Sequence, residues 1–137
     1  MNKPKTILIA DDSEMARTII RRALERETDF EVCGEAVDGT DAVSKAKELS
    51  PDLILLDVRM PGLNGIEVAG ILRGALPQIR IVLVTMFAED VDKGFASFFR
   101  IDAVVSKVGG LANLTTVLAD ILANEQQDSA APGEARL

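Results

Sequence analysis

Residues 51–65 read PDLILLDVRMPGLNG, and this stretch decides the fold. Its wholly apolar run, Leu53–Leu56, is typical of a strand that is buried on both faces, as strands of parallel sheets are. The run ends in Asp57, and Pro61-Gly62 is a strong turn signal. A helix is predicted to follow over Gly65–Arg73. The stretch therefore predicts a buried strand, a loop that opens on a carboxylate, and a helix.

The same alternation extends in both directions along the chain. The predicted strands are Thr6–Ala10, Glu31–Ala36, Leu53–Leu56, Ile79–Val84 and Ala103–Val105. The predicted helices are Ser13–Arg26, Gly39–Leu49, Gly65–Arg73, Glu89–Phe98 and Leu111–Ala123. Five rounds of strand and helix predict an α/β fold, a five-stranded parallel sheet that is doubly wound with helices on both faces. The domain is predicted over residues 1–123, and the polar residues 124–137 are predicted to be a disordered tail or a truncated linker.

Apolar residues recur at helical spacing in two of the predicted helices. In the first predicted helix, apolar residues recur at helical spacing at Met15, Ile19, Ala23 and Leu24. In the fourth, the same argument favours a mostly buried position for Phe95, Phe98 and Phe99. Any exposed member of this phenylalanine group would instead indicate a surface for a partner.

Composition restricts the chemistry. The chain has 137 residues, enough for one domain, and its 15 Lys and Arg oppose 22 Asp and Glu for a net charge of −7. This acidity argues against direct nucleic-acid contact. No histidine is present, which excludes a histidine base and a histidine-ligated zinc. The single cysteine, Cys33, rules out an internal disulfide. The apolar runs are too short to cross a bilayer and no signal peptide is evident, so a cytoplasmic protein without membrane contact is expected.

Polar residues follow four of the five predicted strands. Asp11 and Asp12 follow the first, Asp57 the third, Thr85 the fourth, and Lys107 the fifth. Ligands of open parallel sheets bind beyond the carboxyl ends of the strands, so these side chains are expected to meet at one edge. The sequence therefore predicts three carboxylates, one hydroxyl and one amine in a single site.

Three crowded carboxylates repel one another, and Mg²⁺ would relieve that repulsion. We expect Asp11 and Asp12 to hold the metal, and Asp57 to act as a nucleophile towards a phosphoryl group. Thr85 and Lys107 would help to neutralise the transferred group. A plainer interpretation remains open for each residue alone: Asp12 would cap the following helix, and the others would be ordinary polar residues at strand ends.

The sequence resembles the receiver domain of the two-component response regulators, both chemotaxis-regulator-like receivers and those of nitrate-response-type helix-turn-helix regulators. The resemblance runs from about Lys5 to about Ala123. It is carried, in order, by Ile9-Ala10-Asp11-Asp12, Pro51-Asp52-Leu53-Ile54-Leu55-Leu56-Asp57, Met60-Pro61-Gly62-Leu63-Asn64-Gly65, Val84-Thr85 and Ser106-Lys107.

The resemblance implies a flavodoxin-like fold and transfer of a phosphoryl group from a kinase phosphohistidine to Asp57 with Mg²⁺. It implies that the carbonyl of Arg59 completes the metal shell and that Asp57 is also a metal ligand. It also implies a phosphoacceptor rather than an enzyme, with at most self-phosphorylation and self-dephosphorylation chemistry. Its partners would be a sensor histidine kinase or a phosphotransfer protein, and an output protein or output domain bound through residues 89–123. Homodimer formation on phosphorylation is left open.

Three positions depart from the commonest family pattern. Val104 replaces an aromatic residue whose rotamer is coupled to the hydroxyl at Thr85, and valine is too short and stiff to make that swing. Val108 replaces a proline, and Met86 replaces a small residue beside the site. Met86 and Phe87, the latter together with Arg59, are therefore expected to tune access and the lifetime of the phosphoryl group.

Several functions stay open at this stage. The chain is either a stand-alone regulator or the receiver part of a DNA-binding transcription regulator. A non-phosphorylated interaction module of receiver-like fold is the main alternative, slightly favoured by Val104 and Val108. A phosphoaspartate-type hydrolase is a third class, but such enzymes usually carry a second acid where this chain has Arg59.

Overall fold

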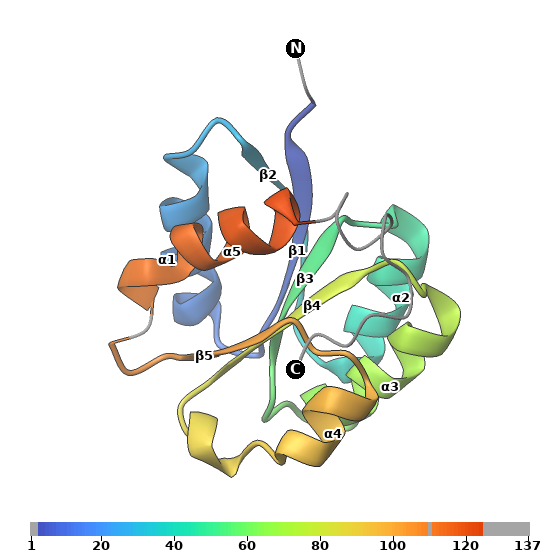
Figure 1. Cartoon of the computed structure of the whole chain (residues 1–137). Helices are drawn as coiled ribbons and strands as arrows, with labels where there is room; N and C mark the ends of the chain where they lie inside the picture. Colours follow the sequence, from blue (N-terminus) through green and yellow to red (C-terminus); the bar gives the residue numbers. More distant parts are fainter. Residues whose placement is uncertain (1–2, 110, 125–137) are drawn as a thin grey trace.

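The computed structural model describes residues 3–109 and 111–124 (Figure 1). The strands are β1 (Lys5–Ala10), β2 (Phe30–Ala36), β3 (Leu53–Asp57), β4 (Arg80–Thr85) and β5 (Ala103–Ser106). The helices are α1 (Glu14–Glu25), α2 (Gly39–Leu49), α3 (Gly65–Ala75), α4 (Lys93–Phe98) and α5 (Leu114–Ala123), with 3₁₀ turns η1 (Ala88–Asp90) and η2 (Leu111–Asn113). Of the predicted tail or linker at 124–137, all but Asn124 lies outside the described residues.

All five strands are parallel and lie in the order β2-β1-β3-β4-β5. The predicted α/β class and the doubly wound, flavodoxin-like arrangement are confirmed. In this order the chain winds outward in opposite directions from the pair formed by β1 and β3. Sheets of this kind bind ligands at that switch point, just beyond the strand ends.

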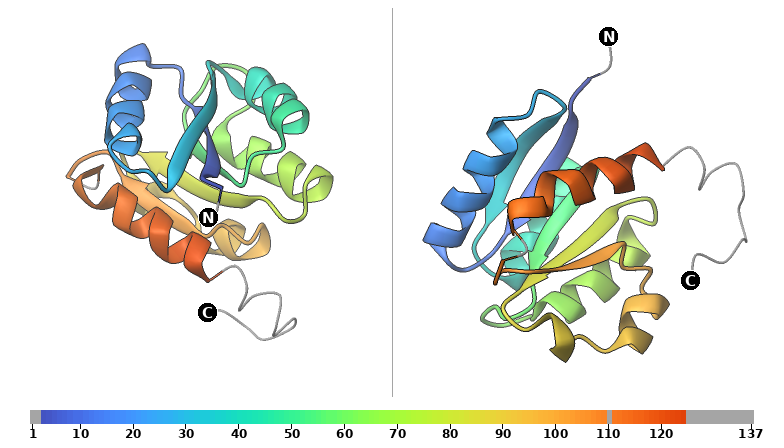
Figure 2. Two further views of the ribbon diagram at one scale, coloured as in Figure 1. Left: turned by 90° about the horizontal axis from the view of Figure 1, so that it is seen from above. Right: turned by 60° about the vertical axis from the view of Figure 1, so that its left-hand side comes forward.

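Two apolar layers follow from the alternation of side chains along each strand. In β1, Ile7 and Ile9 face the layer that α1 and α5 cover, whereas Leu8 and Ala10 face the layer that α2 and α3 cover. The views in Figure 2 show α1 and α5 together on one side of the sheet, and α2 and α3 on the other. Both faces are therefore buried, as the continuous apolar runs predicted.

The fourth helix differs from its prediction over Glu89–Phe98. The segment forms the turn η1, an extended residue at Val91, and then the six-residue helix α4. The side chain of Asp92 accepts hydrogen bonds from the backbone N–H groups of Gly94, at 2.6 Å, and Phe95, at 3.3 Å. Aspartate at such a position starts a helix rather than continuing one, because its carboxylate satisfies the first free N–H groups. A similar shift occurs in the last helix, where η2 precedes α5.

The prediction that the phenylalanine group is mostly core was wrong. Phe95 is 52% exposed and Phe98 is 77% exposed, and α4 has no buried residue. Phe99 alone is half-buried, and a Cβ placed on Gly70 would lie 3.1 Å from its ring. The two exposed rings therefore lie on the surface of α4, and the periodicity argument failed for this short helix.

Only some of the apolar residues at helical spacing in α1 are buried. Ile20 and Leu24, one helical turn apart, are buried. Met15 is 73% exposed and Ile19 is 49% exposed, so they lie on the outer side of the helix. The spacing noted in the sequence therefore included Leu24 but not Ile20.

Gly65 allows α3 to begin directly against the end of β3. A Cβ on Gly65 would lie 2.3 Å from the carbonyl oxygen of Asp57 and 2.8 Å from the Cα of Val58. Gly65→Ala is expected to lower the free energy of unfolding by about 3 kcal/mol, because both obstructing atoms belong to the backbone. Urea unfolding would measure this loss.

Gly74 provides the control in the same helix. No atom lies within 4 Å of a Cβ placed on Gly74. Gly74→Ala is expected to raise the free energy of unfolding by up to about 1 kcal/mol, through helix propensity alone. Equal effects of the two substitutions would show that the contact with Asp57 is unimportant.

Candidate functional site

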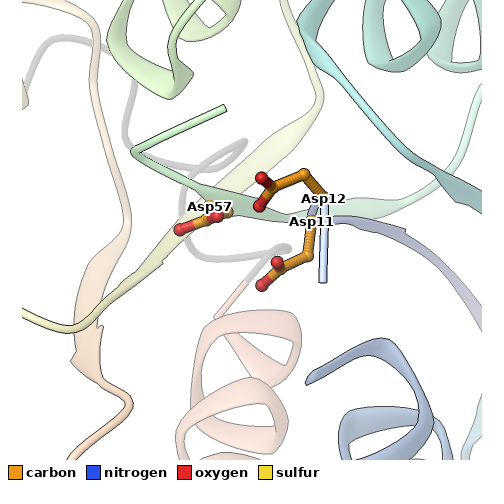
Figure 3. A group of neighbouring side chains, drawn as sticks. All are labelled: Asp11, Asp12 and Asp57. Carbon is orange, nitrogen blue, oxygen red and sulfur yellow. The ribbon is translucent and has the colours of Figure 1, made fainter. Parts of the chain in front are cut away.

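The carboxylates of Asp11, Asp12 and Asp57 converge at the carboxyl edge of the sheet (Figure 3). In the ladder between β1 and β3, Ala10 lies beside Leu56, so the residues that follow each of them are level. One ligand oxygen from each of the three side chains lies within 4.8 Å of the others. The prediction that these strand ends bring three carboxylates together is confirmed.

The three carboxylates differ in their environment. Asp11 is 1% exposed and Asp57 is 6% exposed, whereas Asp12 is exposed. Ser13, and not Asp12, caps α1, because its hydroxyl accepts a hydrogen bond of 3.1 Å from the N–H of Ala16. The capping interpretation of Asp12 was therefore wrong, and its carboxylate is directed towards the other two (Figure 3).

Lys107 lies between the two buried carboxylates. Its ammonium is 2.6 Å from Oδ2 of Asp11 and 3.4 Å from Oδ1 of Asp57. The backbone N–H of Lys107 donates to the carbonyl of Thr85 at 2.8 Å, which extends the pairing of β4 and β5 by one residue. The structure thus joins residues from the ends of β1, β3 and β5 in one ionic cluster.

The protonation of the cluster reflects both burial and charge. Burial raises the pKa of Asp57 to about 6, the charge of Asp11 adds to that rise, and Lys107 opposes it. Burial alone would lower the pKa of Lys107, but its contacts with Asp11 and Asp57 raise it above the ordinary lysine value. One ammonium thus offsets only part of the repulsion among the carboxylates.

The donor set suits a hard divalent cation. Oδ2 of Asp11 is buried, and among the described residues its partner is the ammonium of Lys107 at 2.6 Å, which Lys107 shares with Asp57. Mg²⁺ prefers oxygen ligands and commonly uses one or two carboxylates together with water. Three carboxylates within 4.8 Å of one another that share a single ammonium therefore fit such an ion.

The other predicted residues lie in or near the ends of β4 and β5 and in the loop after β3. Thr85 is 3% exposed, ends β4, and its hydroxyl accepts a hydrogen bond of 3.3 Å from the N–H of Phe87. The guanidinium carbon of Arg59 lies 5.2 Å from the ring centroid of Phe87, a cation–π contact. Met86 is exposed. Val104 is half-buried and packs into the layer under α2 and α3.

The stability of the metal-free protein should depend on the ionisation of Asp57. In the folded state its pKa is about 6, whereas the ordinary value is 3.8, so the folded state holds this proton more tightly. The stability that this bound proton contributes to the folded state is fully present below pH 3.8. It is lost as the pH rises through about 6. We expect Asp57→Asn to become more stable than the wild type over this interval, by on the order of 1 to 2 kcal/mol. Urea unfolding of both proteins in EDTA at several pH values would measure the difference, and parallel pH profiles would contradict it.

Sequence reasoning missed a second group of polar residues next to the cluster. Arg17 donates from Nη1 to the main-chain oxygen of Asp11 at 2.7 Å and from Nε to Glu35 at 2.8 Å. Arg21 also donates to Glu35, at 2.6 Å. The only signal in the sequence is that the two arginines are one helical turn apart, which alone indicates a shared face of α1.

The fold and the cluster together define a flavodoxin-like receiver domain. The family described as "Response regulator receiver domain" matches residues 7–119. The chain therefore belongs to the response regulator receiver family, as its resemblance suggested. Members of this family are signalling modules of two-component systems rather than multiple-turnover enzymes.

Two curated relatives come from staphylococci. The response regulator protein VraR of Staphylococcus epidermidis is 38% identical over 108 residues, which cover 79% of this chain and 52% of the relative. VraR of Staphylococcus aureus is 39% identical over 101 residues, which cover 74% of this chain and 48% of the relative. The chain spans about half the length of the curated relatives it matches.

Solved structures agree with this assignment. The response regulator domain of Thermotoga maritima CheB has a TM-score of 0.74 and 29% identity, over 93% of this chain and 98% of that domain. A DNA-binding response regulator of the LuxR family from Staphylococcus aureus has a TM-score of 0.78 and 27% identity, over 85% of this chain and 98% of that one. Among the described residues, no helix is both long enough and apolar enough to cross a membrane.

Proposed function

We propose that this domain accepts a phosphoryl group on Asp57 from a sensor histidine kinase or a phosphotransfer protein, and that Mg²⁺ is required. The observation that carries the proposal is the cluster of Asp11, Asp12 and Asp57 around a single lysine, at the switch point of the sheet. Ordinary strand ends do not gather three carboxylates, two of them buried, around one ammonium, because such burial is unfavourable without further positive charge.

The proposed roles follow from the positions of the groups. Asp11, Asp12, Asp57 and the main-chain carbonyl of Arg59 would hold the metal, which when bound neutralises charge on the phosphoryl oxygens. An oxygen of Asp57 forms the new P–O bond while the P–N bond to the donor histidine breaks and its electron pair returns to the histidine nitrogen.

The groups around Asp57 have supporting roles in this proposal. The ammonium of Lys107, already 3.4 Å from Asp57, is placed to pair with the added negative charge. The hydroxyl of Thr85 would donate a hydrogen bond to the phosphoryl group, since its present contact with Phe87 uses only its acceptor capacity. Met86, Phe87 and Arg59 would set access to the site and the lifetime of the phosphoryl group.

We infer that the signal leaves through residues 89–123. Phe95 and Phe98 are exposed on α4, which is where a partner surface was expected if these rings were not buried. Val104 has no aromatic ring to swing, so a shift of the loop at Met86–Glu89 together with α4 would carry the change. The receiver would act either alone or as part of a DNA-binding regulator; its LuxR-family neighbour is described as a DNA-binding response regulator. We place this activity in the cytoplasm, and the receiver itself would not contact nucleic acid.

A homodimer on phosphorylation belongs to the same proposal, and light scattering with and without a phosphodonor tests it.

The deciding test is intact mass after incubation with a small phosphodonor, in Mg²⁺ and in EDTA. A phosphoryl adduct is expected only with Mg²⁺, and peptide mapping is expected to place it on Asp57. If neither a small donor nor a phosphorylated histidine kinase produces an adduct, and calorimetry detects no Mg²⁺ binding, the proposal fails. The non-phosphorylated interaction module, which Val104 and Val108 slightly favour, would then replace it.

A further inference from the structure

Arg17 of α1 connects the acidic cluster to β2. Its side chain is 12% exposed, and its two hydrogen bonds point in different directions. Its Nη1 donates to the main-chain oxygen of Asp11 at 2.7 Å, and its Nε donates to Oε1 of Glu35 at 2.8 Å. A planar guanidinium with both groups engaged has little rotational freedom, so it holds the two acceptors at a set separation.

The contact with Asp11 bears directly on the direction of two carboxylates. The oxygen that Arg17 binds belongs to the peptide that joins Asp11 to Asp12, so the orientation of this peptide affects both side chains. Two other hydrogen bonds hold Asp11: its N–H donates to Ala36 at 3.0 Å, and its Oδ1 accepts from the N–H of Ser13 at 2.9 Å. With its N–H, carbonyl and Oδ1 held in this way, Asp11 directs Oδ2 at the ammonium of Lys107 in the cluster, 2.6 Å away.

Glu35 is well placed to brace the arginine. In the pairing of β1 and β2, Glu35 lies beside Ile9, so its carboxylate is near the end of β1. It accepts one hydrogen bond from Arg17 and one of 2.6 Å from Arg21. Both arginines therefore pair with the same carboxylate, but of the two only Arg17 also donates a hydrogen bond to Asp11. The two arginines can therefore be compared directly.

We propose that Arg17, braced by Glu35, is a positioning residue for the divalent cation site. It acts through the main chain of Asp11 and touches neither the metal nor the phosphoryl group. The inference rests on the proposed function, because it concerns the Mg²⁺ affinity of the same cluster. Residues that hydrogen-bond to metal ligands and orient them typically change the affinity for the metal by tenfold or more when they are removed.

The test compares Arg17→Met with Arg21→Met by calorimetric Mg²⁺ titration of the full chain. Both substitutions remove one positive charge and one partner of Glu35, and Arg21→Met also removes an ion pair of 3.3 Å with Glu25. Arg17→Met is expected to bind Mg²⁺ about tenfold more weakly than the wild type. Arg21→Met is expected to stay within about twofold, because Glu35 and Arg17 remain paired.

Further variants separate positioning from folding. Urea unfolding of each protein shows whether it is folded under the titration conditions. Arg17→Lys keeps the charge and one donor, and is expected to recover part of the affinity. If Arg17→Met does not fold, Glu35→Gln decides instead, since it leaves Arg17 in place but removes its charged brace, and affinity at least about threefold below the wild type is expected.

The outcomes distinguish this inference from the function on which it rests. If the wild type binds Mg²⁺ and takes up the phosphoryl group, but Arg17→Met and Arg21→Met have equal affinities, the positioning role is overturned and the proposed function stands. If Glu35→Gln, used in place of an unfolded Arg17→Met, matches the wild type, the same conclusion follows. If the wild type neither binds Mg²⁺ nor is phosphorylated, the proposed function fails, and the positioning role fails with it.

Discussion

Asp57→Asn is expected to remove the phosphoryl adduct completely under conditions in which the wild type is labelled. The amide of asparagine has no anionic oxygen to form the new bond, although it fills the same space at the end of β3. Asp57 is the carboxylate whose pKa burial raises to about 6, and it is still mainly ionised at neutral pH. Intact mass spectrometry after incubation with Mg²⁺ and a small phosphodonor measures the result directly.

Asp12→Asn is the informative control. Asp12 lies in the same cluster but is exposed and has no contact with Lys107 among the described interactions. Its loss is expected to weaken Mg²⁺ binding and to slow labelling, and the adduct should still form at higher Mg²⁺ concentration. An adduct on the Asp57→Asn protein, or complete loss of labelling in Asp12→Asn at saturating Mg²⁺, would contradict the assignment of Asp57 as the nucleophile.

Lys107→Met should destabilise the metal-free protein by about 3 kcal/mol. The ammonium lies 2.6 Å from Asp11 and 3.4 Å from Asp57, and both carboxylates are buried. Removing it leaves two buried negative charges that face each other without their cation. The same change should strengthen Mg²⁺ binding by about tenfold, because one positive charge no longer opposes the metal at close range. Urea unfolding with EDTA and with Mg²⁺ would measure both effects.

Lys47→Met gives a matched substitution on the surface. Lys47 is exposed near the end of α2, so a change of less than about 0.5 kcal/mol is expected there. Mg²⁺ should therefore restore the stability of Lys107→Met to a much greater extent than that of Lys47→Met. If Lys107→Met were as stable in EDTA as Lys47→Met, the ion pairs at the cluster would contribute little, and the repulsion argument would be wrong.

Most of the fold could be predicted because the sheet is buried on both faces. Runs such as Leu53–Leu56 have no polar residue that would allow another role, and the predicted strand boundaries lie within two residues of those observed. The segment from Glu89 to Phe98 could not be predicted in the same way. There the capping carboxylate of Asp92 competed with an apolar periodicity, and the local hydrogen bonds prevailed.

The candidate site was predictable for a related reason. Parallel strands place their carboxyl ends at one edge, so polar residues after successive strands are brought together whatever the loops do. The sequence could not reveal the charge balance within that edge. That Lys107 pairs with Asp11 more closely than with Asp57, and that Arg17 reaches the peptide after Asp11, depends on side-chain directions across three strands and a helix.

The sequence by itself determined the order of strands and helices, the parallel sheet and the set of acidic and basic groups at its carboxyl edge. These features follow from apolar pattern and strand ends, which are local properties of the chain. Only the tertiary structure decided which side of α1 is buried, where α4 begins, and how Asp11 is held by Arg17 and Lys107. Those outcomes depend on which groups, distant in the sequence, pack together, share hydrogen bonds and form ion pairs. The spacing of residues along the chain does not specify these contacts.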